Sequence, residues 1–400
     1  MTLPIPAHSA LLISLTGRDR PGITAEIAGL LAQGGVTLLD VEQVVVQGNL
    51  ALNFLIDASE QDDAARGVLK DLLWKARELN VQVDFRLVDQ HLQRPKRQSW
   101  AVTLLSSRVS ADMLAKAAEA AAARGFNIDR IHRLSGGGLT SIELILSANA
   151  ETTDHPEFKL DLLKLQAQLG CDIALQREGL TRRSKRIVVM DMDSTLIQQE
   201  VIDELARMHG VFDQVAEITH RAMNGELNFD DALRERVMLL KGAPESILTD
   251  VQAKIELTPG AEQLIRVLKK LGYRLAVISG GFIEVAEPIR QRLGLDYAFA
   301  NQLEIVDGKL TGKLLGTIVN RARKADLLES IAQAERVTLD QVIAIGDGAN
   351  DLDMLDRAGL GIAFNAKQKV REQAKYTVNQ RNLDAILYLL GIGDLEASAV

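Results

Sequence analysis

Apolar and polar positions in the first 180 residues follow the same order of elements twice. Alternating runs with the period of a strand are separated by stretches with the spacing of a helix. The expected strands are 10–15, 37–47, 50–57 and 81–88 in the first copy and 100–106, 127–134, 139–147 and 171–177 in the second. The expected helices are 23–33, 63–79, 110–124 and 156–169. The order βαββαβ predicts two small α+β, ferredoxin-like sandwiches with antiparallel sheets.

The rest of the chain has a different pattern, in which continuous apolar runs are separated by helical stretches. These runs are Ile187–Met190, Arg274–Ser279, Val342–Ile345 and Gly361–Phe364. Runs of this kind predict an α/β domain with a Rossmann-like parallel sheet that helices cover on both faces. A long, largely helical insert at about 198–260 is expected to form a cap.

A chain of 400 residues is longer than a domain with a single hydrophobic core usually is. We expect three domains, at 1–92, 98–180 and 185–392, with the cap inserted in the last. The charged segment 177–186 is expected to be a solvated linker between the second and third domains.

Composition narrows the classes of partner and environment. Acidic residues outnumber basic ones by 54 to 46, so the basic excess that nucleic-acid binding requires is missing. No stretch has the length and hydropathy of a membrane span, and no secretory leader is recognisable. Cys171 is the single cysteine, which excludes an internal disulfide framework, and we expect it to be buried. These features favour a cytoplasmic protein without nucleic-acid or membrane partners.

Two carboxylates follow the strand Ile187–Met190, at Asp191 and Asp193. The carboxyl ends of parallel strands form the edge of the sheet where ligands bind. Two neighbouring carboxylates repel each other, so they need a metal, a cation or a shared proton. By itself this pair can also be a strand-ending turn in which an aspartate caps a helix.

Three later segments favour a phosphate site over a simple turn. The strand at 274–279 ends in Ser279, Gly280 and Gly281, which offer a hydroxyl and accessible backbone amides to an anion. Lys324 precedes the next strand and can act as a point charge for phosphate. That strand runs into a tight turn that begins with a glycine and carries two carboxylates and an amide. These residues are Gly346, Asp347, Asn350 and Asp351.

Together these segments resemble the motifs of the haloacid dehalogenase (HAD) superfamily, over residues 185–392. The resemblance implies a phosphatase in which Asp191 is a nucleophile that forms an aspartyl-phosphate. Asp193 would act as general acid and then as general base. Mg²⁺ would be bound by Asp191, the backbone carbonyl of Asp193 and Asp347, with Asp351 orienting these ligands. The residues expected to bind the phosphoryl group are Ser279, Gly280 and Lys324, with Asn350 near the phosphate or the substrate.

The insert resembles the cap of the phosphoserine-hydrolysing family within that superfamily. Glu200 would bind the ammonium group of O-phospho-L-serine, and Arg236 its carboxylate in bidentate geometry. Met223 and Phe229 match the positions that cover the substrate in that family. The resemblance implies hydrolysis of phosphoserine to L-serine and phosphate, the last step of serine biosynthesis.

The first loop of the N-terminal repeat resembles the ligand loop of ACT domains, which bind amino acids. Its residues are Gly17, Arg18, Asp19, Arg20, Pro21 and Gly22. We expect an amino-acid effector such as L-serine here, although a plain β–α turn explains the same residues. The second repeat reads Ser107-Arg-Val-Ser-Ala at this place and lacks the proline and glycines. Exposed edges of such sheets often pair between subunits, so a homodimer is expected.

Two alternatives remain open from the sequence. One is an HAD phosphatase that acts on another small phosphoester. The other is an amino-acid sensor in which the HAD part is a scaffold without catalytic activity.

Overall fold

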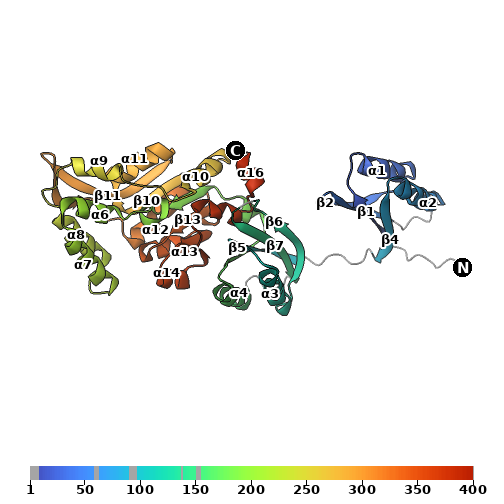
Figure 1. Cartoon of the computed structure of the whole chain (residues 1–400), viewed down its shortest axis with the longest axis horizontal. Helices are drawn as coiled ribbons and strands as arrows, with labels where there is room; N and C mark the ends of the chain where they lie inside the picture. Colours follow the sequence, from blue (N-terminus) through green and yellow to red (C-terminus); the bar gives the residue numbers. More distant parts are fainter. Residues whose placement is uncertain (1–8, 58–62, 90–96, 137, 150–154, 400) are drawn as a thin grey trace. The chain divides into compact units, whose positions relative to one another are not determined.

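The computed structural model describes residues 9–57, 63–89, 97–136, 138–149 and 155–399 (Figure 1). The chain divides into two compact units, residues 1–96 and 97–400. The predicted first domain, 1–92, therefore includes some positions that lie outside the described residues.

The first unit is one α+β sandwich. Its elements are β1 (Ser9–Arg18), α1 (Ile23–Gln33), β2 (Leu38–Val46), β3 (Asn49–Asp57), α2 (Asp63–Glu78) and β4 (Val81–Asp89). The antiparallel sheet has the order β2-β3-β1-β4. Alternate residues of β1 and β3, such as Ile13 and Phe54, are buried against Ile27 of α1 and Leu72 of α2. β2 is an edge strand whose residues are all exposed, including Val41 and Val46.

The second sandwich opens the second unit and repeats the topology. Its elements are β5 (Arg97–Ser106), α3 (Ala111–Ala123), β6 (Asn127–Arg133), β7 (Thr140–Asn149), α4 (Pro156–Leu169) and β8 (Asp172–Arg177), in the sheet order β6-β7-β5-β8. One face of this sheet packs on α3 and α4 and buries Cys171, as expected. The predicted fold class of both repeats is confirmed.

The other face of the second sandwich packs on the C-terminal part of the chain. Leu105 and Ala174 belong to the same apolar core as the large parallel sheet. The buried Asp172 carboxylate accepts hydrogen bonds from the Asn379 backbone N–H at 2.8 Å and from the Gln380 side chain at 2.6 Å. Gln176 donates to the Leu389 carbonyl at 2.8 Å. This polar face, with its few apolar contacts, joins the two domains into one unit.

The prediction that 177–186 is a solvated linker is wrong for two of its charges. The segment forms a short helix, α5 (Leu180–Arg183), and Arg182 is only 4 % exposed. Its guanidinium pairs with Glu143 of β7 and with Glu178. Lys185 is 6 % exposed and donates to the Asp340 carbonyl. Buried charges require partners, and here Glu143 and Asp340 lie far away in the sequence, where a local pattern does not reveal them.

Burial lowers the pKa of Lys185 from its ordinary 10.5 to about 8. Between these values the unfolded chain binds more protons than the folded one, so the contribution of Lys185 to stability rises with pH through this window. From about pH 7.5 to about pH 9.5, calorimetry should show wild type gaining about 2 kcal/mol over Lys185→Met. Parallel pH profiles for the two proteins would contradict this expectation.

The third domain is built on a seven-stranded sheet. Its strands are β9 (Ile187–Met190), β10 (Arg274–Phe282), β11 (Tyr297–Val306), β12 (Lys309–Leu315), β13 (Val342–Gly346), β14 (Leu360–Phe364) and β15 (Tyr376–Val378), in the order β12-β11-β10-β9-β13-β14-β15. All neighbours are parallel except β11 and β12, which form an antiparallel hairpin at one edge. The predicted parallel sheet is confirmed, and the hairpin and β15 add to the predicted strands.

Helices cover both faces of this sheet. A ligand site is therefore expected at the edge formed by the carboxyl ends of the strands. The helices outside the cap are α10 (Ala261–Lys270), α11 (Ile283–Leu293), α12 (Arg321–Ala334), α13 (Leu352–Arg357), α14 (Gln368–Gln373), α15 (Ile386–Leu389) and α16 (Asp394–Ser398), with short 3-10 turns at Leu339–Gln341, Ala349–Asp351 and Leu383–Ala385. Val188 and Met190 face the core that contains α10 and α11, whereas Ile187 and Val189 face α12 and α13.

The cap is a group of four helices between β9 and β10 (Figure 1). They are α6 (Val201–His209), α7 (Phe212–Met223), α8 (Phe229–Leu239) and α9 (Ser246–Gln252). None of the helices in the described part of the chain combines the length and hydropathy needed to span a bilayer.

Candidate active site

Three adjacent strands deliver the polar residues to one edge of the sheet. β9 lies between β10 and β13; the chain passes from β9 to β10 on one side and reaches β13, on the other side, only after β12. The carboxyl ends of β9 and β13 lead into Asp191 and Asp347, and Ser279 lies near the carboxyl end of β10. The Asp191 backbone N–H donates to the Ile345 carbonyl at 2.8 Å, so the sheet pairing extends to the catalytic candidate itself. This is the crevice in which open α/β sheets bind ligands.

Asp191 is 4 % exposed and lies in contact with a buried lysine. The Nζ atom of Lys324, in the first turn of α12, is 2.8 Å from Asp191 Oδ1 and 2.7 Å from Asp351 Oδ1. The second oxygen of Asp351 accepts the Gly348 backbone N–H at 2.9 Å. Lys324 is fully buried, so its charge acts on the two carboxylates without screening by water.

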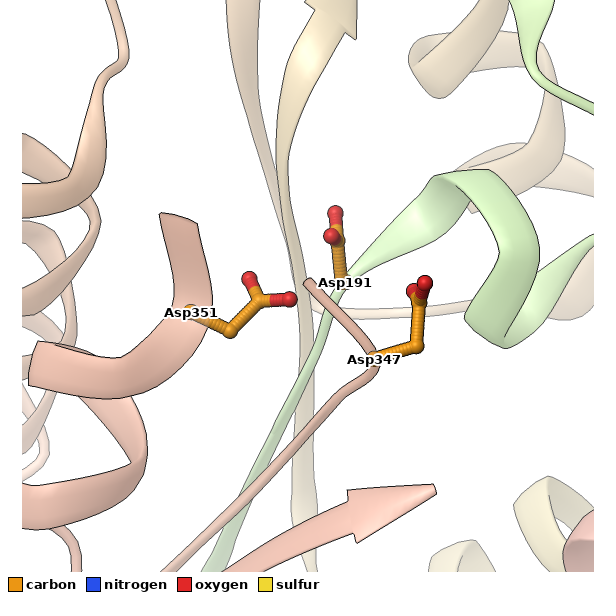
Figure 2. A group of neighbouring side chains, drawn as sticks. All are labelled: Asp191, Asp347 and Asp351. Atoms are coloured by element: carbon orange, nitrogen blue, oxygen red, sulfur yellow. The ribbon is translucent and has the colours of Figure 1, made fainter. Parts of the chain in front are cut away.

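Three carboxylates surround one position at this edge (Figure 2). Oxygen atoms of Asp191, Asp347 and Asp351 all lie within 4.8 Å of one another. Since Lys324 offsets one of the three negative charges, an excess of two remains. Hard carboxylate oxygens with this excess charge fit a divalent cation such as Mg²⁺.

The pKa values show how strongly the cluster needs a cation. Burial, followed by the charge of Asp351, raises the pKa of Asp191 well above its usual value. The same two causes raise the pKa of Asp347 to about 7. Burial lowers the pKa of Lys324, but Asp191 and Asp351 outweigh it and hold that pKa above the ordinary range. The lysine therefore stays charged, and a further cation would favour the ionised forms of Asp191 and Asp347.

Asp193 lies in the π turn Met192–Leu196, and both of its carboxylate oxygens accept hydrogen bonds. Its Oδ2 accepts the Ser279 hydroxyl at 2.8 Å, and its Oδ1 accepts the Val201 backbone N–H at 2.8 Å. Burial, followed by the charge of Glu200, raises the pKa of Asp193 to about 6. A carboxyl group with this pKa can both release and accept a proton near neutral pH.

Two glycines allow the loops to approach these carboxylates. A Cβ atom on Gly281 would lie 2.7 Å from Asp193 Oδ2, and one on Gly346 would lie 2.4 Å from the Asp351 carboxyl carbon. Real side chains do not tolerate such contacts, so both positions depend on glycine.

Two residues of the cap carry charges next to this edge. The Glu200 carboxylate, at the start of α6, accepts the Ser194 hydroxyl at 2.7 Å. The half-buried Arg236, on α8, donates to the Ala232 carbonyl at 3.2 Å and to the Thr219 hydroxyl at 3.4 Å. Among the described residues, no carboxylate forms an ion pair with Arg236, which leaves its guanidinium available to an anion.

The predicted covering residues differ in their surroundings. The Phe229 ring lies over Gly280, since a Cβ atom on this glycine would be 3.0 Å from the ring and 3.6 Å from the Asn350 amide nitrogen. Asn350 and Phe229 thus both lie next to Gly280 of the predicted phosphate loop Ser279–Gly281, on the side toward which a Cβ atom would point. Met223 ends α7 and is 58 % exposed, so the structure does not bring it against the other predicted site residues.

The predicted effector loop is more extended than a simple turn. Gly17 and Arg18 are the last residues of β1, where Gly17 pairs with Val81 and Leu50. The exposed residues Asp19, Arg20 and Pro21 follow, and Gly22 precedes α1 with a φ of 100°. Pro21 therefore lies before the helix and not in its first turn.

Three site residues were not predicted. Ser194, with a φ of 55°, orients Glu200, and the Thr195 hydroxyl donates to Asp347 at 2.8 Å. Both follow Asp193 directly, so the motif itself offered the signal. Asn301 donates to the Gly280 carbonyl at 2.8 Å from the neighbouring strand β11, and no local pattern marks it.

Comparison with known proteins agrees with this arrangement. Residues 188–356 match the model of haloacid dehalogenase-like hydrolases, and residues 9–86 and 98–176 each match an ACT domain. The chain is 46 % identical to a phosphoserine phosphatase of Streptomyces coelicolor over 97 % of this chain and 94 % of the relative. It is 40 % identical to a phosphoserine phosphatase of Mycobacterium tuberculosis, over 98 % and 96 %. A solved HAD family hydrolase of Salmonella enterica is 32 % identical, with a TM-score of 0.64 over 72 % of this chain and 98 % of that one.

The parallel sheet, the helical cap and the acidic edge define a haloacid dehalogenase-type hydrolase that carries two ACT domains. Identity at this level extends across the ACT domains as well as the hydrolase domain. The chain belongs to the phosphoserine phosphatase family.

Proposed function

We propose that this enzyme hydrolyses O-phospho-L-serine to L-serine and phosphate, through an aspartyl-phosphate on Asp191. The observation that carries the proposal is the buried Asp191 carboxylate, which touches Lys324 and faces two further carboxylates at the edge of a parallel sheet. An oxygen of Asp191 forms a bond to phosphorus while the bond between phosphorus and the serine oxygen breaks. Asp193 gives its proton to that oxygen, and L-serine leaves.

The second half-reaction uses the same two residues. Asp193, now a carboxylate, accepts a proton from water, whose oxygen bonds to phosphorus. The bond between phosphorus and Asp191 then breaks and releases phosphate. The Val201 backbone N–H, which donates to Asp193, keeps this carboxyl group oriented through both steps.

Mg²⁺ is the proposed cofactor, held by Asp191, the Asp193 backbone carbonyl and Asp347. It would offset the charge of the phosphate and of the clustered carboxylates. Asp351 would orient the site through its contacts with Lys324 and the Gly348 amide. We also propose that Lys324, Ser279, Gly280 and Asn350 bind the phosphoryl oxygens.

The cap would select the amino-acid part of the substrate. Glu200 offers a carboxylate to the substrate ammonium, and Arg236 offers its carboxylate a guanidinium that forms no ion pair with the described residues. Burial lowers the pKa of Arg236, which the nearby carboxylates of Asp203, Glu200 and Asp193 partly oppose. Phe229 would cover the bound substrate, and Met223 would join it when the cap closes.

Substitution of Arg236 or Glu200 by alanine should affect phosphoserine and an aryl phosphate to different extents. Each change should lower kcat/KM for phosphoserine by about a hundredfold, because one charge-assisted contact with the substrate is lost. Activity toward an aryl phosphate, which has neither amino-acid charge, should change by less than about threefold. Steady-state kinetics on both substrates would measure this.

Arg234→Ala is the matched control, because Arg234 is exposed on the same helix and pairs only with Asp231 among the described residues. Equal losses on both substrates would instead favour a phosphatase for another small phosphoester. A folded protein without any turnover would favour the amino-acid sensor.

The N-terminal domains carry further proposals. We infer that residues 17–22 bind an amino-acid effector, with L-serine as feedback inhibitor, because exposed loop amides and the start of α1 meet there.

The exposed apolar side chains of the edge strand β2 support a homodimer. We propose a cytoplasmic location and domain bounds of 1–92, 98–180 and 185–392.

A further inference from the structure

The cap helix α8 begins with a side-chain contact to the body of the hydrolase domain. Asn228 caps the helix and Phe229 follows it. The next residue, Asp230, accepts hydrogen bonds from the Asn320 amide nitrogen, at 3.1 Å to Oδ1 and 3.3 Å to Oδ2. Both side chains are half-buried. A charge-assisted contact of this kind, partly shielded from water, is stronger than a surface pair of neutral groups.

Asn320 occupies a position that connects several parts of the site. Its Oδ1 atom caps α12 by accepting the Arg323 backbone N–H at 3.1 Å, and Lys324 follows in the first turn. The preceding backbone N–H, from Val319, donates to Asn301 at 2.8 Å, and Asn301 in turn donates to the Gly280 carbonyl. The segment Val319–Asn320 therefore contacts Asp230 of the cap directly and contacts the phosphate loop through Asn301.

The far end of α8 is fixed by different means. A Cβ atom on Gly312 of β12 would lie 3.2 Å from the Met238 Cα, so the helix packs closely on the hairpin there. Gly242 also donates to the Leu310 carbonyl at 2.8 Å. Asp230 and Asn320 thus tie the end of α8 that carries Phe229, and Arg236 lies between the two attachments.

We propose that Asp230 and Asn320 are a positioning pair for substrate recognition: their contact sets the orientation of α8 that places Phe229 over Gly280 and Arg236 toward the substrate carboxylate. This inference rests on the proposed phosphoserine activity. Neither residue touches the reacting atoms, so the pair acts through α8 and affects binding of the amino-acid part more than the transfer of phosphate.

Exchanging the carboxylate of Asp230 and the amide of Asn320 tests this proposal. Asn320→Asp keeps the oxygen that caps α12 but places two carboxylates face to face, which should separate α8 from the segment. KM for phosphoserine should rise about tenfold. The kcat for phosphoserine and the kcat/KM for an aryl phosphate should each stay within about twofold of wild type. The double variant Asp230→Asn, Asn320→Asp restores one amide and one carboxylate with the donor reversed. Its KM for phosphoserine should return to within about threefold of wild type.

Hydrogen exchange gives a readout that needs no substrate. The amides at the start of α8 should exchange faster in Asn320→Asp than in wild type and the double variant, with melting temperatures that stay close. An unchanged KM and exchange rate in Asn320→Asp would overturn the proposal. A double variant as impaired as Asn320→Asp would overturn it too, because the defect would then lie in α12 alone. If wild type itself does not prefer phosphoserine to the aryl phosphate, the proposed function fails, and the exchange data still report on the contact.

Discussion

Asp191→Asn should lower phosphoserine hydrolysis by at least about a thousandfold, because an amide oxygen does not form the acyl-phosphate that the reaction requires. The substitution keeps the shape of the side chain, and the new carbonyl oxygen can still accept the Met192 backbone N–H, which the native carboxylate accepts at 2.7 Å. Lys324 retains its contact with Asp351. Loss of activity would therefore report chemistry rather than a collapsed site.

Stability distinguishes this loss from unfolding. Asp191 is buried beside like charges, which raise its pKa, so its neutral replacement relieves repulsion in the metal-free protein. The melting temperature of Asp191→Asn without metal should equal or exceed that of wild type. Beryllofluoride with Mg²⁺, which mimics the aspartyl-phosphate, should stabilise wild type but not the variant. A variant that retains activity, or that still responds to beryllofluoride, would exclude Asp191 as the nucleophile.

Shortening the chain at two positions should have very different effects. A chain that begins at Arg97 keeps the whole second unit, so its melting temperature and its activity should stay near those of the full chain. A chain that begins at Arg183 loses the second sandwich, including the packing of Leu105 and Ala174 and the hydrogen bonds of Asp172. Its stability should fall by about 3 kcal/mol, which lowers the melting temperature by about 6–12 °C.

The same pair of truncated chains tests regulation. If residues 17–22 bind L-serine, inhibition by L-serine should disappear in both chains. Inhibition that persists in the chain from Arg97 would place the inhibitor at the active site or on the second sandwich. Calorimetry and steady-state kinetics on the three proteins decide both questions. Equal melting temperatures for the two truncated chains would contradict the view that the second sandwich belongs to the hydrolase unit.

Much of the fold could be predicted because its signals are local. Strand and helix periods gave both βαββαβ repeats, and their structural bounds differ from the expected ones by only a few residues. The predicted elements do not include the β11–β12 hairpin, although Asp307 and Gly308 between two apolar runs are a strong turn signal, and both have positive φ angles in the structure. The buried ion pair of Arg182 with Glu143 is of another kind, because its partners are 39 residues apart.

The site shows the same division. Strand-ending motifs indicated Asp191, Asp347 and Ser279, since parallel strands bring their carboxyl ends together. The position of Lys324 between Asp191 and Asp351 depends on how α12 packs, and the sequence gives no geometry for that. Asn301 carries no motif at all, and its role follows only from the hydrogen bond to Gly280.

The polar face between the second sandwich and the hydrolase domain also bears on how such chains evolve by recombination. Asp172, Gln176 and Gln166 match groups on Asn379, Leu389 and Thr377, so complementary halves of one joint are encoded about two hundred codons apart. A gene fusion that exchanged only residues 97–182 would pair mismatched halves and leave buried groups without partners. Exchange of the first unit leaves all of these matches within residues 97–400 intact.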